Sequence, residues 1–420
     1  MKSAILIVTI LITSLGTTHL NAQKTVIVSR EGKWQLTIDN QPFFIKGVVG
    51  HTYMEKVAAY GGNSVRIGWS KDELDQANKL GLKALICLHA DAERYGMNYD
   101  DSLAVAKQMA EIIEIVKKTK DHPAVLIWAI GNELDYIPGT LPFKLSLWDA
   151  VNNIAKAIKA IDPNHPVMTV IGTSMMEKVA DIVKQCPDID LLGVNTYGDI
   201  YNLSQTLKKY GWQKPYVITE WGPDGYWEVR KTSWNAPYEQ TGREKYDCYE
   251  NKYFKAIDTG DCLGSYVFYW FNKQETTHTW FSMFDEKGQE TPLPKLMKML
   301  WTGKRDNNLA PVVDSLNIDD FVRYQDICLK QGSKHRAKVQ ASDPDGDAIS
   351  YLWEIRPEAI YASYAGQGEK EPQPIAGLIE GNGQSISIKV PSQSGAYRLF
   401  VYAFDKNMQF STANLPFIVK

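Results

Sequence analysis

Two glutamates are the residues of this sequence best suited to catalysis. Glu133 ends the segment VLIWAIGNE, which begins at Val125, and Glu220 ends the segment VITE, which begins at Val217. A carboxylate at the end of a buried strand is costly unless it has partners. Buried carboxyl groups are required by some reactions. Cleavage of a glycosidic bond, for example, needs one protonated and one ionised carboxyl group on opposite sides of the bond.

Other polar and aromatic side chains stand at the same end of neighbouring apolar segments. They are His51, Arg66, His89, Asn132, Asn195, Tyr197, Trp221 and Trp270. Each alone has a structural explanation, since a lone His is usually a satisfied hydrogen-bonding residue and an Arg beside a strand is often in an ion pair. Together they predict one site. Arg66 and Tyr197 can hold one carboxylate ionised, while a less charged pocket keeps the other protonated.

A repeated unit of strand, loop and helix must position these residues. The expected strands are 43–47, 63–67, 83–88, 124–130, 166–170, 191–194, 215–219 and 265–270. The expected helices are 70–81, with a capping box from Ser70 to Glu73, and 103–116, 148–161, 246–257 and 292–300. Eight strands alternating with helices over roughly 260 residues predict an α/β fold, the (β/α)₈ or TIM barrel, with its site at the C-terminal strand ends.

A doubly wound open sheet is the main alternative to the barrel. Such a sheet usually carries a glycine-rich phosphate-binding turn after its first strand. The segment GVVGH at 47–51 does not fit that pattern. The barrel is therefore the predicted fold class.

The sequence divides into five segments. Residues 1–22 combine Lys2, an apolar stretch and small residues, which predicts a secretory signal peptide. A β-hairpin is expected at 23–42, the catalytic barrel at 43–303, a polar linker at 304–311 and an immunoglobulin-like β-sandwich at 312–420. The last segment contributes nothing to the set of strand-end residues, so its deletion is expected to leave the chemistry intact.

The segment DPDGDAISYLWEI resembles the start of immunoglobulin-like, PKD-like or cadherin-like modules found on secreted enzymes. Asp343, Asp345 and Asp347 imitate the spacing of a calcium-binding loop, with Glu354 further on. Ala348 stands where that loop needs glycine, so a solvated turn is the preferred interpretation.

Composition excludes several classes of protein. The 420 residues carry a net charge of −3, which gives no basic surface for nucleic acid or anionic lipid. No long apolar run follows residue 22, so we expect a secreted or periplasmic protein that does not insert into a membrane. Five scattered cysteines lack metal-ligand spacing, and no metal or cofactor is expected; a bridge between Cys248 and Cys262 stays open.

The two glutamate segments are similar to signatures of known glycosidases. HPAVLIWAIGNE at 122–133 resembles the acid/base motif of glycoside hydrolase family 2 and its relatives in the (β/α)₈ clan A, and PYVITEWG at 215–222 resembles the nucleophile strand of that clan. The resemblance implies that Glu133 protonates the leaving oxygen and that Glu220 is the nucleophile of a retaining mechanism.

Weaker resemblances assign roles to four further residues. GGNSVRI is similar to a family 5 segment whose Arg pairs with the nucleophile, here Arg66. LICLHA resembles a strand with a substrate-binding His, here His89, and VNTY resembles a motif whose Tyr donates to the nucleophile, here Tyr197. YVFYW resembles an eighth strand whose Trp floors the sugar site, here Trp270. The resemblance covers 43–303 and mixes family 2 and family 5 features.

The sequence thus predicts a secreted retaining β-glycosidase acting on a β-linked oligo- or polysaccharide, with a β-glucan as one candidate. A glycan transglycosylase using the same site is the first alternative. A non-catalytic carbohydrate-binding barrel is the second, and the paired glutamates argue against it. The aromatic residues expected near the barrel mouth, as candidate sugar subsites, are Trp69, Tyr95, Tyr136, Trp221, Tyr226, Trp227 and Trp280. The oligomeric state has no signal in the sequence.

Overall fold

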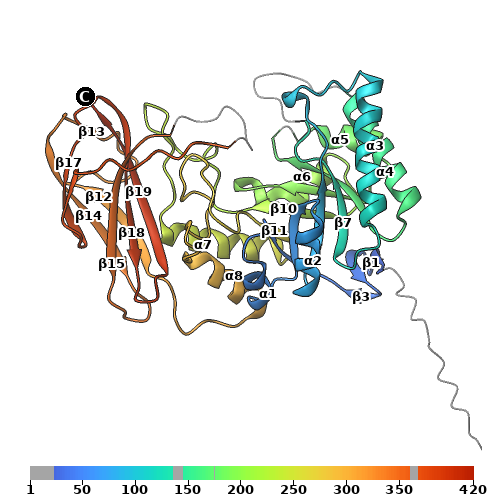
Figure 1. The fold of residues 1–420 in the computed structure, drawn as a ribbon, viewed down its shortest axis with the longest axis horizontal. Coiled ribbons are helices and arrows are strands. Elements are labelled where there is room, and N and C mark those ends of the chain that lie inside the picture. Colours follow the sequence, from blue (N-terminus) through green and yellow to red (C-terminus); the bar gives the residue numbers. More distant parts are fainter. Residues whose placement is uncertain (1–22, 136–144, 175, 360–367) are drawn as a thin grey trace, which may run out of the picture.

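A computed structural model of the protein describes residues 23–135, 145–174, 176–359 and 368–420. Two bodies lie side by side in it: a barrel surrounded by helices, and a body of strands formed by the C-terminal part of the chain (Figure 1). The predicted signal segment and Tyr136 lie outside the described residues. Among the helices within these ranges, none combines the length and the apolar character needed to cross a bilayer.

The predicted barrel is confirmed. In the described chain, eight parallel strands close into one ring, in which β11 pairs with β4 and each other strand pairs with the next in sequence. The strands are β4 (Ile45–Val49), β5 (Ser64–Gly68), β6 (Lys83–Leu88), β7 (Val125–Ile130), β8 (Val167–Gly172), β9 (Leu191–Asn195), β10 (Tyr216–Trp221) and β11 (Gly264–Val267). Each overlaps one of the predicted strands.

Eight helices surround the barrel in the described part of the chain. They are α1 (Met54–Ala59), α2 (Lys71–Lys79), α3 (Ser102–Thr119), α4 (Ser146–Ile161), α5 (Lys178–Gln185), α6 (Leu203–Lys209), α7 (Gly242–Lys252) and α8 (Pro292–Thr302). Ser70 accepts the Glu73 N–H at the start of α2, and Thr241 and Glu244 form a reciprocal capping box at α7. The sequence patterns did not predict α1, α5 or α6, which are all short.

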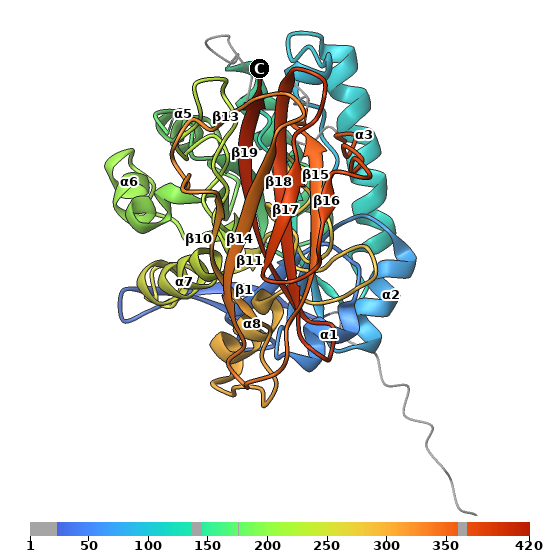
Figure 2. The same cartoon turned by 90° about the vertical axis from the view of Figure 1, so that its left-hand side faces the viewer.

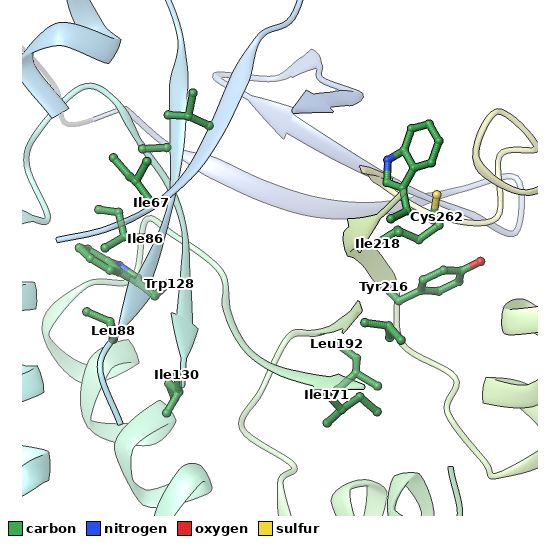
Figure 3. Packing of buried hydrophobic residues seen from close by; sticks show 14 of the residues in the cluster. Ile67, Ile86, Leu88, Trp128, Ile130, Ile171, Leu192, Tyr216, Ile218 and Cys262 are labelled. Atoms are coloured by element: carbon green, nitrogen blue, oxygen red, sulfur yellow. The ribbon is translucent and has the colours of Figure 1, made fainter. Parts of the chain in front are cut away.

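Alternation along β7 gives this strand two apolar faces. Trp128 and Ile130 of β7 point outward into the layer between strands and helices, together with Ile86 and Ile171 (Figure 3). Ile127 and Ala129 belong to a separate cluster that fills the barrel interior. All six residues of β7 are buried for this reason. The filled interior gives the site a rigid apolar floor.

The N-terminal segment covers the end of the barrel away from the site. It forms a three-stranded antiparallel sheet of β1 (Thr25–Arg30), β2 (Lys33–Ile38) and β3 (Gln41–Pro42), one strand more than the predicted hairpin. Leu36 is buried in the same cluster as Ile45 and Ile127. The sheet therefore packs against the apolar interior of the barrel.

The C-terminal body consists of two four-stranded sheets that share one apolar cluster. One sheet contains β12 (Val312–Ile318), β14 (Lys334–Ser342), β17 (Ser385–Lys389) and β16 (Ile379–Glu380). The other contains β13 (Cys328–Leu329), β19 (Phe410–Val419), β18 (Gly395–Phe404) and β15 (Ser350–Pro357). Figure 2 shows these strands in front of the barrel. Val339 of the first sheet and Leu399 of the second meet in the shared core, so the two sheets form a sandwich.

In the turn that carries the three aspartates, the Asp343 side chain accepts hydrogen bonds from backbone N–H groups of the same turn. Asp343 Oδ1 accepts the N–H groups of Asp345 and Asp347 at 2.9 and 3.0 Å. Within the part of the chain that the structure describes, no group of three or more His, Cys, Asp or Glu residues has the arrangement of a metal site.

None of the five cysteines forms a disulfide. Burial raises the pKa of the Cys262 thiol, and likewise that of Cys186, to about 12. The bridge between Cys248 and Cys262 that the sequence left open is therefore absent from the fold.

Candidate active site

The C-terminal ends of the barrel strands surround a cavity of about 940 Å³. Its lining includes Asn132, Glu133, Asn195, Tyr197 and Glu220, which come from β7, β9 and β10 or from the residues just after them. We call these five residues, together with Arg66, the strand wall of the cavity. Arg66 of β5 lies behind Glu220 and Asn132, to which it donates hydrogen bonds.

A sharp turn after β7 places Glu133. Gly131 and Glu133 both have left-handed backbone angles, with φ of 66° and 47°. The Glu133 N–H donates to the Val170 carbonyl of the next strand at 2.9 Å, which ties the turn to the barrel. A non-glycine residue in this conformation is strained, and such strain persists only where surrounding contacts fix it. Gly172 leaves space beside the carboxyl group, since an added Cβ would lie 3.0 Å from Glu133 Oε1.

Both oxygens of Glu220 accept hydrogen bonds from the barrel. Arg66 Nη1 donates to Oε1 at 2.6 Å, and the Tyr197 hydroxyl donates to Oε2 at 3.1 Å. Burial, together with the charge of Glu220, raises the pKa of Tyr197 well above its ordinary value, so the hydroxyl stays protonated and remains a donor. A buried guanidinium and a donor hydroxyl together stabilise the ionised form of the carboxylate they contact.

Glu133 has different partners. Asn195 Nδ2 donates to Glu133 Oε1 at 2.9 Å, and Thr219 Oγ1 holds the amide by donating to Asn195 Oδ1 at 2.8 Å. Burial raises the pKa of Glu133, and the charge of Glu220 raises it further; the Asn195 hydrogen bond and the charge of Lys178 act in the opposite direction. The surroundings of Glu133 thus favour its protonated form more than the surroundings of an exposed carboxyl group would.

Arg66 and Asn132 connect the two carboxyl groups. Arg66 Nη2 donates to Asn132 Oδ1 at 2.6 Å while Nη1 donates to Glu220. Asn195 Nδ2 reaches the same Asn132 oxygen at 3.1 Å as well as Glu133. The network fixes the two carboxyl groups relative to one another through residues in the barrel strands or directly after them.

The rim of the cavity carries a histidine and several half-exposed rings. His89 lies there with its side chain 84% exposed and its Nε2 2.8 Å from Asp91 Oδ1. Trp69, Tyr95 and Trp227 line the cavity and are half-exposed, and the Trp69 indole N–H donates to Thr119 Oγ1. Exposed, anchored ring faces are suited to stacking on sugars.

Besides Arg66, three expected site residues lie outside the cavity lining. His51 is exposed and lies 3.4 Å from Glu73. Trp221 follows Glu220 in the same strand and therefore points outward, where it is fully buried against Tyr249. Trp270 lies beyond the end of β11 and packs on Trp301. It therefore does not form the floor of the sugar site, as the sequence had predicted.

Residues of the loop after β11 line the side of the cavity where Trp270 was expected. Phe268, Lys273 and Glu275 reach the cavity, and we call them the loop wall. Lys273 Nζ lies 2.5 Å from Glu275 Oε2 and 4.7 Å from the centre of the Phe268 ring. Sequence patterns missed this wall because FNKQET has neither strand nor helix periodicity. Arg94 was also missed; its Nη2 donates to the Asn132 carbonyl at 3.4 Å.

One known family is similar to a large part of the barrel. The family described as "Glycosyl hydrolases family 2, TIM barrel domain" matches residues 72–255, which include both glutamates. Residues 72–255, less than half of the chain, are therefore similar to a glycoside hydrolase barrel of family 2.

Two of the curated proteins that match the chain have a named activity. A β-glucuronidase of Streptococcus agalactiae is 29% identical over 151 residues, which cover 33% of this chain and 23% of that protein. A β-galactosidase of Leuconostoc mesenteroides is 21% identical over 46% of this chain and 21% of its own length. The matches thus span less than a quarter of these curated relatives.

Solved structures share the fold. A calcium-binding mutant of Bacteroides uniformis β-glucuronidase 2 superposes with a TM-score of 0.51 at 12% identity, covering 92% of this chain and 46% of that one. An FMN-binding β-glucuronidase from Facaelibacterium prausnitzii gives 0.51 at 16% identity, covering 95% and 59%.

Proposed function

We propose that this protein is a secreted retaining β-glycosidase, with Glu133 as acid/base and Glu220 as nucleophile. The observation that carries the proposal is the asymmetry between the two carboxyl groups. Arg66 and Tyr197 donate to Glu220, whereas Glu133 is desolvated, contacts a neutral amide and has a raised pKa. Retaining hydrolysis uses such a pair, one ionised to attack and one protonated to donate.

The reaction then runs in two balanced steps. In the first, a Glu220 oxygen bonds to the anomeric carbon, the bond to the leaving oxygen breaks, and Glu133 gives its proton to that oxygen. In the second, the Glu133 carboxylate takes a proton from water, the water oxygen bonds to the anomeric carbon, and Glu220 leaves. Release of Glu220 is assisted by the Arg66 and Tyr197 donors that stabilise its negative charge.

The size and lining of the cavity support a β-linked oligo- or polysaccharide as substrate, with a β-glucan as one candidate. Three half-exposed rings at the rim offer faces for sugar units beyond the one that reacts. A β-glucuronide is a second candidate, since several relatives are described as β-glucuronidases and Lys273 brings a cation into the cavity. Glu275 pairs with that cation, which favours neutral sugars.

The test is product analysis with a panel of aryl β-glycosides and β-linked oligosaccharides. Hydrolysis of at least one member with first appearance of the β-anomer by NMR supports the proposal. First appearance of the α-anomer would contradict retention. Products longer than the substrate would favour the transglycosylase, and binding without any bond cleavage would favour the non-catalytic barrel.

A further inference from the structure

Lys273 and Glu275 of the loop wall belong to residues 273–278, a short segment with two faces. Lys273 and Glu275 face the cavity, whereas the residues between and after them, Gln274, Thr276 and His278, make their contacts with the C-terminal sandwich. Successive residues of an extended chain point to opposite sides. What fixes the outer face of the segment therefore also fixes the inner face.

The tip of this segment is held by a carboxylate of the sandwich. Thr276 has φ of 66°, a strained conformation for a β-branched residue, between reciprocal backbone hydrogen bonds of Glu275 and Thr277. Glu369 Oε2 accepts the Thr276 N–H at 2.7 Å and the Gln274 side-chain amide at 3.4 Å. A strained turn of this kind needs an external partner to keep it in place.

The residues after the tip are held by strands β18 and β19. The His278 ring stacks on the Tyr402 ring at an interplanar angle of 28°, with 6.0 Å between centroids, and its Nε2 is within hydrogen-bonding distance of the Tyr402 hydroxyl. Burial lowers the pKa of His278 to about 3, so the ring is neutral at ordinary pH. Thr277 and Asn414 both donate to Glu239 Oε2 at 2.6 Å, which joins segment, barrel and sandwich at one buried carboxylate.

We propose that the C-terminal sandwich is a positioning element of the active site. Through Glu369 and Tyr402 it holds the segment 273–278, so that Lys273 and Glu275 form a wall that determines substrate binding. Deletion of this module was expected to leave the chemistry intact; kcat should still be kept, but substrate binding should weaken. The inference rests on the proposed glycosidase function for its kinetic part, but the order of the segment is measurable without any substrate.

The kinetic test compares Glu369→Ala and Tyr402→Phe with Glu380→Ala. Glu380 is a matched control, because its carboxylate pairs with Lys334 on the exposed face of the sandwich. With the best substrate of the panel, both test variants should raise KM about three- to tenfold with kcat within twofold, since the strand wall is untouched. The control should change neither constant. A fall in kcat with unchanged KM, or no change in either test variant, would overturn the proposal.

A second measurement separates failure of this inference from failure of the proposed function. Hydrogen exchange of the Thr276 amide and its neighbours, measured without substrate, should accelerate at least tenfold in Glu369→Ala at unchanged Tm, and stay as in the wild type in Glu380→Ala. Unchanged protection in Glu369→Ala would refute the positioning role even if no glycoside proved to be a substrate. In addition, Glu369→Ala should no longer raise KM when Lys273 and Glu275 are already replaced by Ala. If Glu369→Ala raised KM by the same factor in that background, its effect would not act through the loop wall.

Discussion

The two walls of the cavity are built in different ways. The strand wall takes its six side chains from the barrel strands and the residues directly after them, and its hydrogen bonds stay inside the barrel. The loop wall takes Lys273 and Glu275 from an irregular segment whose outer face is held by a separate body of the protein.

This difference assigns different tasks to the two walls. Bond breaking tolerates little movement of the carboxyl groups, and strands of a closed barrel supply the most rigid support available. Recognition of the sugar can be changed without loss of chemistry when it is carried by a loop, as is common in TIM barrels. Variants of the strand wall should therefore lower kcat, and variants of the loop wall should raise KM.

The largest effects are expected from the two glutamates. Glu220→Ala should lose hydrolysis on the order of 10⁴–10⁶-fold, because no glycosyl-enzyme forms. Glu133→Ala should lose about 10²–10⁴-fold with a poor leaving group and little in the first step with an activated aryl glycoside.

Azide separates the two roles. In Glu133→Ala it should attack the glycosyl-enzyme, restore turnover and give the β-glycosyl azide; in Glu220→Ala it should attack the substrate directly and give the α-azide. NMR of the products decides. The reverse pattern would exchange the two assignments, and a β-azide from both variants would show that Glu220 is not the nucleophile.

Loss of Arg66 should have the next largest effect. Arg66→Met leaves Glu220 without its cation in a buried site, where removal of one partner costs about 3–5 kcal/mol, so kcat should fall about 10²–10⁴-fold. Arg243→Met is the control, because its ion pair with Asp314 is partly exposed and contributes little. Steady-state kinetics and Tm of both variants check this; equal kcat in the two variants would contradict a special role for Arg66.

The pH dependence should report Glu133. Activity needs its protonated form, so kcat/KM should fall as pH rises through the raised pKa of Glu133, above the range of an exposed carboxyl group. Glu220→Gln removes a negative charge that contributes to this rise, so the pKa of Glu133 should become lower, while burial keeps it above its ordinary value. Titration of the ¹³C-labelled Glu133 carboxyl by NMR measures both; an unchanged pKa in Glu220→Gln would mean that the two groups are not coupled.

Most of the strand wall was predictable from sequence for a physical reason. Arg66, Asn195, Tyr197 and the two glutamates are attached to strands whose apolar pattern is strong, and parallel strands of a barrel bring their C-terminal ends together. Trp221 was misplaced because its neighbour Glu220 already occupies the inward position of β10. Trp270 was misplaced because β11 ends at Val267.

The loop wall was not predictable in the same way. Its position depends on contacts such as the one between Thr276 and Glu369, which are 93 residues apart in the chain and lie in different bodies of the protein. Neither residue belongs to a periodic pattern. The sequence therefore indicated the chemistry of the site more clearly than the recognition of its substrate.

Lys273→Met should have a moderate effect that depends on the charge of the sugar. The variant removes the only positive partner that the loop wall offers to substrate, so KM for an aryl β-glucuronide should rise about tenfold and KM for the matching β-glucoside about two- to threefold. Kinetics with the two substrates measures the ratio. An equal rise in KM for both substrates would exclude Lys273 as a contact for a sugar carboxylate. A large fall in kcat would show that the loop wall also takes part in bond breaking.

The smallest effect, and the finest test of the strand wall, is expected at Gly172. A methyl group there would lie 3.0 Å from Glu133 Oε1, closer than ordinary van der Waals contact, so the acid must shift slightly. Gly172→Ala should therefore lower kcat/KM about two- to tenfold with a poor leaving group, for which the position of the proton matters, and hardly at all with an activated aryl glycoside. Gly68→Ala is the matched control, since Gly68 also lines the cavity and an added Cβ there meets nothing within 4 Å. For each variant, the ratio of kcat/KM for the activated glycoside to kcat/KM for the glycoside with the poor leaving group is measured. A change in this ratio reports a shift of Glu133, whereas a general disturbance of the cavity would leave the ratio unchanged. If Gly172→Ala slowed both substrates equally, the added methyl group would be acting on binding or folding, and the assignment of Glu133 as a rigidly placed proton donor would lose its support.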